Sequence, residues 1–172
     1  RSTRVRSSAA SDVYKRQAMG SEISGDIRNV TIRSCLMDNE NWSPLRFKSQ
    51  PSRGGTVENI TFEDITIKGA RSIFDINMEW RMVPPLLPAH YPLTCLRNIH
   101  FKNINGEAQS AGTMYGFKEA PFGNDTFFFE NCHIKAQKGL SISNVANVNF
   151  KGLELEIKEG EKIYERSANK DK

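Results

Sequence analysis

Hydrophobic residues recur along this chain in a repeated unit of the form Asn-apolar-x-apolar-x-x-apolar. Within each unit the apolar residues alternate with polar ones, and the alternation then shifts by one position. A period of two is typical of a β-strand, and the shift indicates a bend between two short strands. The five units begin at Asn29, Asn59, Asn98, Thr126 and Asn147.

A further short strand is predicted at a nearly constant distance after each of the first four unit starts, near Leu45, Ile73, Gly112 and Leu140. Strands that are one repeat apart run in the same direction, and no single repeat can bury its own apolar face. The pattern therefore predicts an all-β fold, a right-handed parallel β-helix of about five coils from which the N-terminal coils are missing.

In such a solenoid, corresponding residues of successive coils lie above one another, about 4.8 Å apart. Three interior stacks are expected: Val30, Ile60, Ile99, Phe127 and Val148; Ile32, Phe62, Phe101, Phe129 and Phe150; and Cys35, Ile65, Ile104, Cys132 and Leu153. Cys35 and Cys132 thus take the place of aliphatic residues. They lie too many coils apart for a disulfide, which needs Cα atoms within about 7 Å.

The asparagines at the unit starts suggest two interpretations. Asn29, Asn59, Asn98 and Asn147 fall at one corner of the solenoid, where their amides are expected to form a ladder that bonds the backbone between coils. Asn29 and Asn59, with Asn41 and Asn124, also begin N-x-S/T glycosylation sequons. We favour the ladder, because Thr31 and Thr61 are ordinary outward strand positions.

The chain divides into three segments by composition. Residues 1–17 are rich in Arg and Ser and are predicted to be a disordered or artefactual tail. Residues 18–160 hold the repeats and form the β-helix domain, and residues 161–172 are predicted to be a polar tail. The net charge of +4 comes entirely from the first segment, which weakens the case for a nucleic-acid partner.

Several other classes of protein and site are disfavoured. No stretch approaches the roughly 18–20 apolar residues of a membrane span, so no membrane partner is expected. His90, His100 and His133 lie on different repeats, without nearby ligands at metal-binding spacing, and no phosphate-binding loop is present. We therefore expect no metal and no cofactor.

The order of the motifs resembles glycoside hydrolase family 28, the polygalacturonase-like pectin hydrolases, in its bacterial branch. The matching elements are GSEISG at 20–25, NVTIRSCLM at 29–37, RFK at 46–48 and RGGTVENI at 53–60. The agreement covers residues 18–80 and continues more loosely to about residue 157.

The resemblance implies inverting hydrolysis of an α-1,4 linkage beside galacturonate. It also implies an acidic plant cell-wall polysaccharide as partner (pectin, galacturonan or rhamnogalacturonan oligomers), a secreted or periplasmic location and a monomer. The family's N-x-D, D-D and G-H-G motifs precede its G-S-E element, and none of them stands before GSEISG in this sequence, so we expect no catalytic residue in this fragment. Inverting hydrolysis needs two carboxyl groups about 6.5–9.5 Å apart, and the chain alone is expected to be inactive and poorly stable.

Arg46 and Lys48 match the family residues that hold the substrate carboxylate. Residues two apart on a strand face the same side, so both cations project together while Phe47 points into the core. A guanidinium beside an ammonium suits a uronate carboxylate. Alanine at either position should weaken binding and barely change Tm, whereas a large fall in Tm would indicate an ion pair with Asp75, the outward residue one coil further on.

The aromatic residue of the family pattern corresponds to Trp80, which is expected to contact the substrate or, alternatively, to anchor a loop. Trp42, Asp75, His90 and Tyr91 are candidates for the rim of the cleft. Glu22, Asp38, Glu40 and Asp75 are the carboxylates from which a catalytic pair could be drawn, but ion pairs or solvated positions explain them adequately.

Two other functions remain open at the level of sequence. A pectate-lyase-like β-helix would need a calcium-binding cluster of acidic residues, and such a cluster is not evident. A non-enzymatic carbohydrate-binding β-helix would not require Arg46 and Lys48 on one outward face.

Overall fold

The computed structural model describes residues 17–20, 23, 25–38, 42–80, 88 and 92–166. These residues form strands and connecting turns, with no helix among them. The strands are β1 (Gln17–Met19), β2 (Ile27–Asp38), β3 (Leu45–Lys48), β4 (Thr56–Asn77), β5 (Cys95–Tyr115), β6 (Phe127–Glu130), β7 (Cys132–Ser143) and β8 (Leu153–Glu165).

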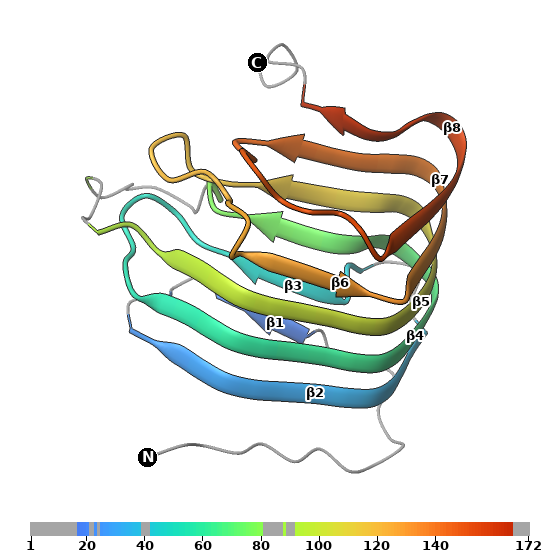
Figure 1. Cartoon of the computed structure of the whole chain (residues 1–172), viewed down its shortest axis with the longest axis horizontal. Coiled ribbons are helices and arrows are strands. Elements are labelled where there is room, and N and C mark those ends of the chain that lie inside the picture. The colour runs from blue at the N-terminus through green and yellow to red at the C-terminus, as the bar shows by residue number, and fades with distance from the viewer. Residues whose placement is uncertain are drawn as a thin grey trace.

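The strands pair in parallel and wind into a parallel β-helix, as the repeat predicted. Each coil runs along one layer, turns at the edge of the molecule and returns in the opposite layer (Figure 1). The register confirms the predicted rows: Val30 pairs with Ile60, Ile60 with Ile99, and Ile99 with Phe127. Corresponding residues of neighbouring coils therefore lie side by side across the whole solenoid.

The strands are longer than the short strands expected from sequence, because the bends interrupt them at single residues. Asn29, Asn59 and Asn98 have φ angles of 58°, 55° and 55°, the left-handed region that asparagine tolerates better than most residues. The backbone turns there and pairing resumes at the next residue. Each of β4 and β5 consequently runs through both layers.

The ladder of asparagines is present at this first bend. The Asn59 Nδ2 donates to Asn29 Oδ1 at 2.9 Å, and the Asn98 Nδ2 donates to Asn59 Oδ1 at 2.6 Å. The amides thus bond one another, whereas bonds to the backbone were expected from the sequence. The ladder ends at Asn98, because the next coil has Thr126 at this position and separates Asn147 from it.

A second ladder, which the sequence reading missed, explains the shift of phase inside each unit. The residues at the shift all have positive φ: Ser34, Asp64, Asn103, Asn131 and Gly152. Asn103 Nδ2 donates to Asp64 Oδ1, and Asn131 Nδ2 donates to Asn103 Oδ1, both at 2.9 Å. In each coil one residue therefore forms this bend without pairing, so the next apolar residue points inward again.

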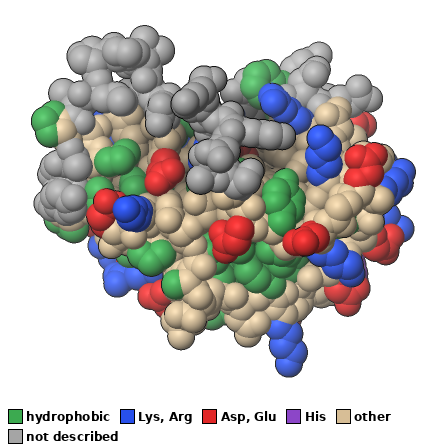
Figure 2. Space-filling view, turned by 90° about the horizontal axis from the view of Figure 1, so that it is seen from above, with side chains coloured by type: hydrophobic (Ala, Val, Ile, Leu, Met, Phe, Trp, Pro, Cys, Tyr) green, Lys and Arg blue, Asp and Glu red, His purple; other side chains and the backbone are tan. Residues whose placement is uncertain are grey.

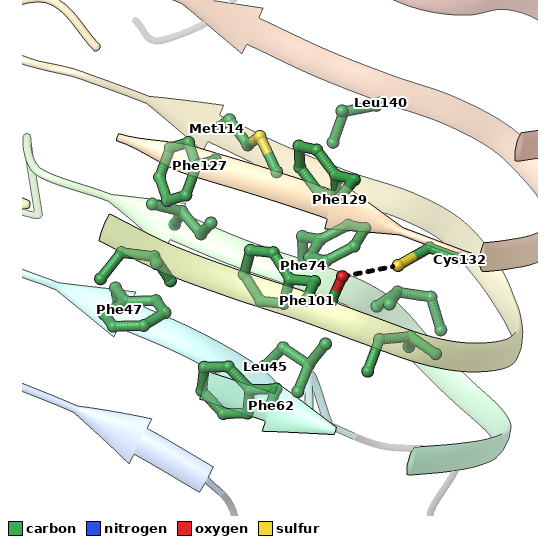
Figure 3. Packing of buried hydrophobic residues seen from close by; sticks show 14 of the residues in the cluster. Leu45, Phe47, Phe62, Phe74, Phe101, Met114, Phe127, Phe129, Cys132 and Leu140 are labelled. Carbon is green, nitrogen blue, oxygen red and sulfur yellow. Dashed lines mark hydrogen bonds between the residues drawn. The ribbon is translucent and has the colours of Figure 1, made fainter. Parts of the chain in front are cut away.

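The core lies between the two layers and is rich in phenylalanine (Figure 3). The Phe101 ring stacks on Phe62 and on Phe129, with ring centroids 5.4 Å apart in both pairs. Phe74, from the opposite layer, meets Phe101 edge-on at 5.1 Å. Such offset and edge-to-face contacts add about 0.5–1.5 kcal/mol per pair to the burial of the rings.

The three cysteines differ in burial. Cys132 is fully buried, as predicted, and its thiol lies 3.2 Å from the Phe101 carbonyl oxygen (Figure 3). Cys35 is only half-buried, because among the described residues β2 pairs with β4 alone. Cys95 is exposed, and all three thiols are free.

The boundary of the solenoid lies further toward the C-terminus than predicted. Strand β8 continues past residue 160 to Glu165 and pairs with β7, so residues 161–165 are not a tail. Their sequence is polar because, within the described part of the chain, β8 pairs with β7 alone and most of its side chains are exposed. Figure 2, seen from this end, shows hydrophobic side chains flanked by Lys, Arg, Asp and Glu.

The N-terminal boundary also differs from the prediction by one residue, because Gln17 pairs with Leu45.

Candidate carboxylate-binding site

The candidate site lies on one layer of the solenoid, which we call the site sheet. It consists of β1, β3 and the last parts of β4, β5, β7 and β8. On β3, Leu45 and Phe47 are fully buried, which directs Arg46 and Lys48 to the outer face of this sheet. The predicted alternation is therefore confirmed.

Asp75 lies directly beside Arg46 on the neighbouring strand, and the two form an ion pair. The pairing register joins these residues, and Arg46 Nε lies 2.6 Å from Asp75 Oδ2. The side chains are 12% and 18% exposed, so the pair is largely shielded from water. Within the described part of the chain, Arg46 Nε makes no hydrogen bond of standard geometry, so the contact is close but poorly aligned.

The environment of Asp75 acts on its pKa in two directions. Burial raises the pKa of this carboxyl above its usual value, while the cations Arg46, Lys48 and Arg71 draw it down. The effect of burial is the larger one, so the pKa of Asp75 is raised. The charge of Asp75 is therefore only partly compensated by its neighbours, and the pair is costly to break on either side.

Trp80 completes the cluster by contacting both cations. Its ring centroid lies 5.0 Å from the Arg46 guanidinium carbon and 4.8 Å from Lys48 Nζ, within the range of a cation–π interaction. Its backbone N–H donates to the Ser49 carbonyl at 2.9 Å, which holds the residue beside the end of β3. Met78, two residues before Trp80, is 1% exposed and anchors this turn in the core.

A glycine from the first matched motif supports the strand that bears the cations. Gly20 has a φ of 104°, and a Cβ there would lie 1.9 Å from the Lys48 carbonyl oxygen. No other residue fits without moving the backbone. Gly20, the first residue of the GSEISG element, therefore packs directly against the strand that bears the cations.

The other sequence candidates lie apart from this cluster or cannot be placed. Trp42 precedes β3, at the opposite end of that strand from Lys48. Its ring is 41% exposed, and its carbonyl accepts a hydrogen bond from the Arg71 N–H. His90 and Tyr91 lie outside the described residues. We use the name Arg46 cluster for Arg46, Lys48, Asp75 and Trp80.

The structure also shows a second cation on the same outer face that the sequence reading did not single out. The guanidinium carbon of Arg166 lies 4.7 Å from the centroid of the Tyr115 ring, and the Tyr115 hydroxyl donates to Ser141 Oγ at 3.0 Å. The sequence predicts a polar tail over residues 161–172, so Arg166 is not among its candidate residues. Within residues 161–166 only Ile163 is partly buried, so no alternation of apolar and polar residues marks this end of the strand.

Chemically, the groups of the Arg46 cluster are suited to an anion. It presents an arginine fork and an ammonium, which bind carboxylates through charge-assisted hydrogen bonds. Among the described residues, no three His, Cys, Asp or Glu side chains gather in a way that would hold a metal ion. The same part of the chain has no helix that is long and apolar enough to cross a membrane.

Comparison with known proteins agrees with this geometry. No curated protein and no solved structure matched the chain. One protein-family model does match, that of the glycosyl hydrolases family 28, over residues 18–154. The matched region contains most of the β-helix, including the whole Arg46 cluster, and covers well over half of the chain. The chain therefore belongs to glycosyl hydrolases family 28.

Proposed function

We propose that this protein is a polygalacturonase-like hydrolase of α-1,4-linked galacturonan, and that Arg46 and Lys48 bind a carboxylate of the sugar chain. The observation that supports the proposal most is the convergence of both cations on Trp80, on the outer face of the site sheet. Two scattered surface bases would have no reason to share one aromatic ring. In this cluster, the ring restricts where the two charges can lie.

Each member of the cluster has a distinct role in the proposal. Lys48 and the guanidinium nitrogens of Arg46 that do not face Asp75 supply the hydrogen bonds to the uronate. Asp75 is a positioning residue, which keeps Arg46 on the outer face when no ligand is bound. Trp80 orients both cations, at about 0.5–1 kcal/mol for each contact.

The proposal assigns binding, rather than bond cleavage, to these residues. Asp75 is the carboxylate of the cluster, and it is already paired with Arg46, so it is poorly suited to deliver or take up a proton. None of the N-x-D, D-D and G-H-G motifs stands before the GSEISG element, where the family has them. We therefore expect the 172-residue chain to bind galacturonan without hydrolysing it. The polymeric substrate also implies that the protein acts outside the cytoplasm.

The test is a calorimetric titration of the chain with a galacturonate trimer, beside the neutral galactose trimer. Lys48→Ala should weaken the binding of the galacturonate trimer by about 10- to 150-fold, because a hydrogen bond to a charged group is worth about 1.5–3 kcal/mol. Lys68→Ala is the matched control, since it removes an exposed lysine from β4 outside the site sheet. It should leave binding unchanged.

Two results would contradict the proposal. Equal affinity of the parent and Lys48→Ala for the galacturonate trimer would remove Lys48 from the site. Equal affinity for the charged and the neutral trimer would show that the carboxylate is not what is recognised. Release of reducing ends by the chain would refute the separate expectation that it lacks hydrolytic activity.

A further inference from the structure

Ser49 follows Lys48 at the end of β3, and all three of its polar groups are bonded inside the protein, where the residue is 0% exposed. Its backbone N–H donates to the Asn77 carbonyl at 3.0 Å, and its carbonyl accepts from the Trp80 N–H at 2.9 Å. Its hydroxyl lies 2.7 Å from Thr94 Oγ1. Ser49 therefore connects the strand that bears the cations with Trp80 and with the residue that precedes β5.

The direction of the hydrogen bond between Ser49 and Thr94 follows from a third group. The Thr94 hydroxyl donates to the Gly54 carbonyl at 3.2 Å, and a hydroxyl has a single proton to donate. Thr94 Oγ1 therefore accepts from the Ser49 hydroxyl. Thr94 is only 4% exposed, so a variant without this oxygen would leave the Ser49 hydroxyl and the Gly54 carbonyl unsatisfied in a place shielded from water.

These bonds join the two ends of the longest interruption of the repeat, which begins after Trp80 and ends at Thr94. The strand pairing that aligns the coils elsewhere does not reach either residue, because β4 ends at Asn77 and β5 begins at Cys95. The position of Trp80 beside β3 therefore depends on bonds outside the sheet, among them its bond to Ser49.

The contact between Lys48 and Trp80 spans this connection. Lys48 directly precedes Ser49 in the chain, and Lys48 Nζ lies 4.8 Å from the centroid of the Trp80 ring. A shift of the Ser49 backbone would therefore move the cation and the ring relative to each other. Binding groups act well only when supporting bonds of this kind hold them within about 0.5 Å of the productive geometry.

We propose that Ser49 and Thr94 are positioning residues, and that their buried hydroxyl pair holds Trp80 against Lys48 in the geometry that binds a carboxylate. This inference rests on the proposed function of the Arg46 cluster and adds two residues that act through it. Both hydroxyls are shielded from solvent and bonded to protein groups, so they do not contact the ligand themselves. The competing view is that the pair contributes to stability alone.

The test compares two variants of Thr94 with one variant of another buried threonine. Thr94→Val keeps the branched shape and removes the acceptor of the Ser49 hydroxyl, whereas Thr94→Ser keeps a hydroxyl at this position. Thr126→Val is the matched control, because Thr126 is 3% exposed, its Oγ1 accepts from the Gly123 N–H at 3.0 Å, and it precedes β6, outside the site sheet. Each full 172-residue chain is titrated calorimetrically with a galacturonate trimer, well below its Tm.

Thr94→Val should weaken the binding of the trimer by about two- to tenfold, the range that corresponds to one hydrogen bond. Thr94→Ser should bind close to the parent, because the chain of hydroxyls can form again. Thr126→Val should also bind like the parent, although it too loses a buried hydroxyl and some stability. A loss of affinity confined to Thr94→Val therefore separates positioning from stability.

Tryptophan emission gives a second measurement, which needs no ligand. The chain has two tryptophans, so the Trp42→Phe background reports Trp80 alone. Thr94→Val in that background should shift the emission maximum to longer wavelength, because a ring released from its two cations gains contact with water. Thr94→Ser and Thr126→Val should leave the maximum in place.

Two results would overturn the inference while the proposed function stands. One is a Thr94→Val variant that binds the trimer as the parent does, although Lys48→Ala weakens binding. The other is an equal loss of affinity in Thr94→Val and Thr126→Val, which would assign the effect to stability. If Lys48→Ala leaves binding unchanged, the proposed function itself fails, and an unchanged emission maximum in Thr94→Val would then overturn the positioning role as well.

Discussion

Arg46 and Asp75 occupy the same place on neighbouring coils, and their side chains are in contact at 2.6 Å. This relationship gives the two cations of the site different roles. Arg46 is tied to a shielded carboxylate, whereas Lys48 pairs in register with the neutral Asn77. The sequence alone treated the two as equivalent, with little effect of either on stability.

The first prediction follows from that difference. Arg46→Ala leaves the Asp75 charge shielded from water without its nearest cation, which costs about 1–3 kcal/mol. For a chain of this size, Tm should fall by about 2–4 °C for each kcal/mol. Lys48→Ala should change Tm by less than about 2 °C.

Thermal unfolding followed by circular dichroism measures both changes. The double variant Arg46→Ala, Asp75→Ala serves as the control, because it removes both charges together. It should be more stable than Arg46→Ala alone. Equal losses of stability in Arg46→Ala and Lys48→Ala would refute the distinction between the two cations.

The second prediction concerns Asp75 and the binding of uronate. Asp75→Asn keeps an oxygen that can accept from Arg46 and removes a negative charge beside the site, so affinity for the galacturonate trimer should stay the same or rise, by up to about fivefold. Asp75→Ala removes the oxygen as well and lets Arg46 move, so affinity should fall by a similar factor.

The comparison of the two Asp75 variants at constant ionic strength distinguishes the positioning of Arg46 by Asp75 from the effect of the Asp75 charge on the ligand. If both bind more tightly than the parent, then Asp75 acts only as a repulsive charge and does not position Arg46. If both bind more weakly, the negative charge itself is required, in contradiction to the role proposed for it.

The third prediction concerns the asparagine ladder. Asn59 bonds Asn29 on one side and Asn98 on the other, at a φ of 55°. Asn59→Ala loses both bonds and places a less tolerant residue in the left-handed region, at a cost of about 1–3 kcal/mol. Asn59→Gly loses the bonds but not the backbone conformation, so it should be less destabilising.

Urea unfolding gives the free energies for this series. Thr61→Val is the matched control, because it abolishes the sequon of Asn59 and preserves the ladder and the β-branched shape. It should be close to the parent. If Thr61→Val is as unstable as Asn59→Ala in protein made without glycosylation, the ladder is not the cause.

The fourth prediction concerns pH. Burial lowers the pKa of His100 below its ordinary value of 6.5, and its ring stacks on Phe128 while Nε2 bonds Asn98 Oδ1 at 2.7 Å. Lys102 also disfavours the charged form, and Glu130 favours it. As pH falls below 6.5, the unfolded chain takes up a proton at this residue more readily than the folded chain, so stability decreases.

The measurement is Tm as a function of pH, from neutral to mildly acidic, for the parent and His100→Gln. The variant cannot titrate at this position, so its Tm should fall less steeply below pH 6.5. Parallel curves for the two proteins would show that His100 is not coupled to folding.

The architecture could be predicted from the sequence because equivalent positions of the repeat are the residues that pair between neighbouring coils. The pairing of the strands confirms most of each interior row, such as Ile32, Phe62, Phe101 and Phe129, and Phe150 stacks on Phe129. Val148 lies outside the strands, and its place in the first row stays a prediction. The second ladder was also visible in principle. Ser34, Asp64, Asn103, Asn131 and Gly152 are residue types that favour turns or tolerate positive φ, and they occupy one position of the repeat.

The site was only partly predictable. The outward direction of Arg46, Lys48 and Asp75 followed from the alternation on their strands. The contact of Trp80 with both cations did not, because it depends on the turn after β4, which is set by the burial of Met78 and the bond from Trp80 to Ser49. Arg166 was missed because an exposed edge strand has too few buried residues for its alternation to be recognised.

The register between coils has a consequence for how this molecule could be resized. Since each coil adds one strand spacing and keeps every row in place, duplication of residues 59–97 as a block would lengthen the solenoid without disturbing its corners. The separation of Lys48 and Arg166 would then grow by about 4.8 Å. The number of coils thus sets the distance between the backbone positions at the two ends of one row.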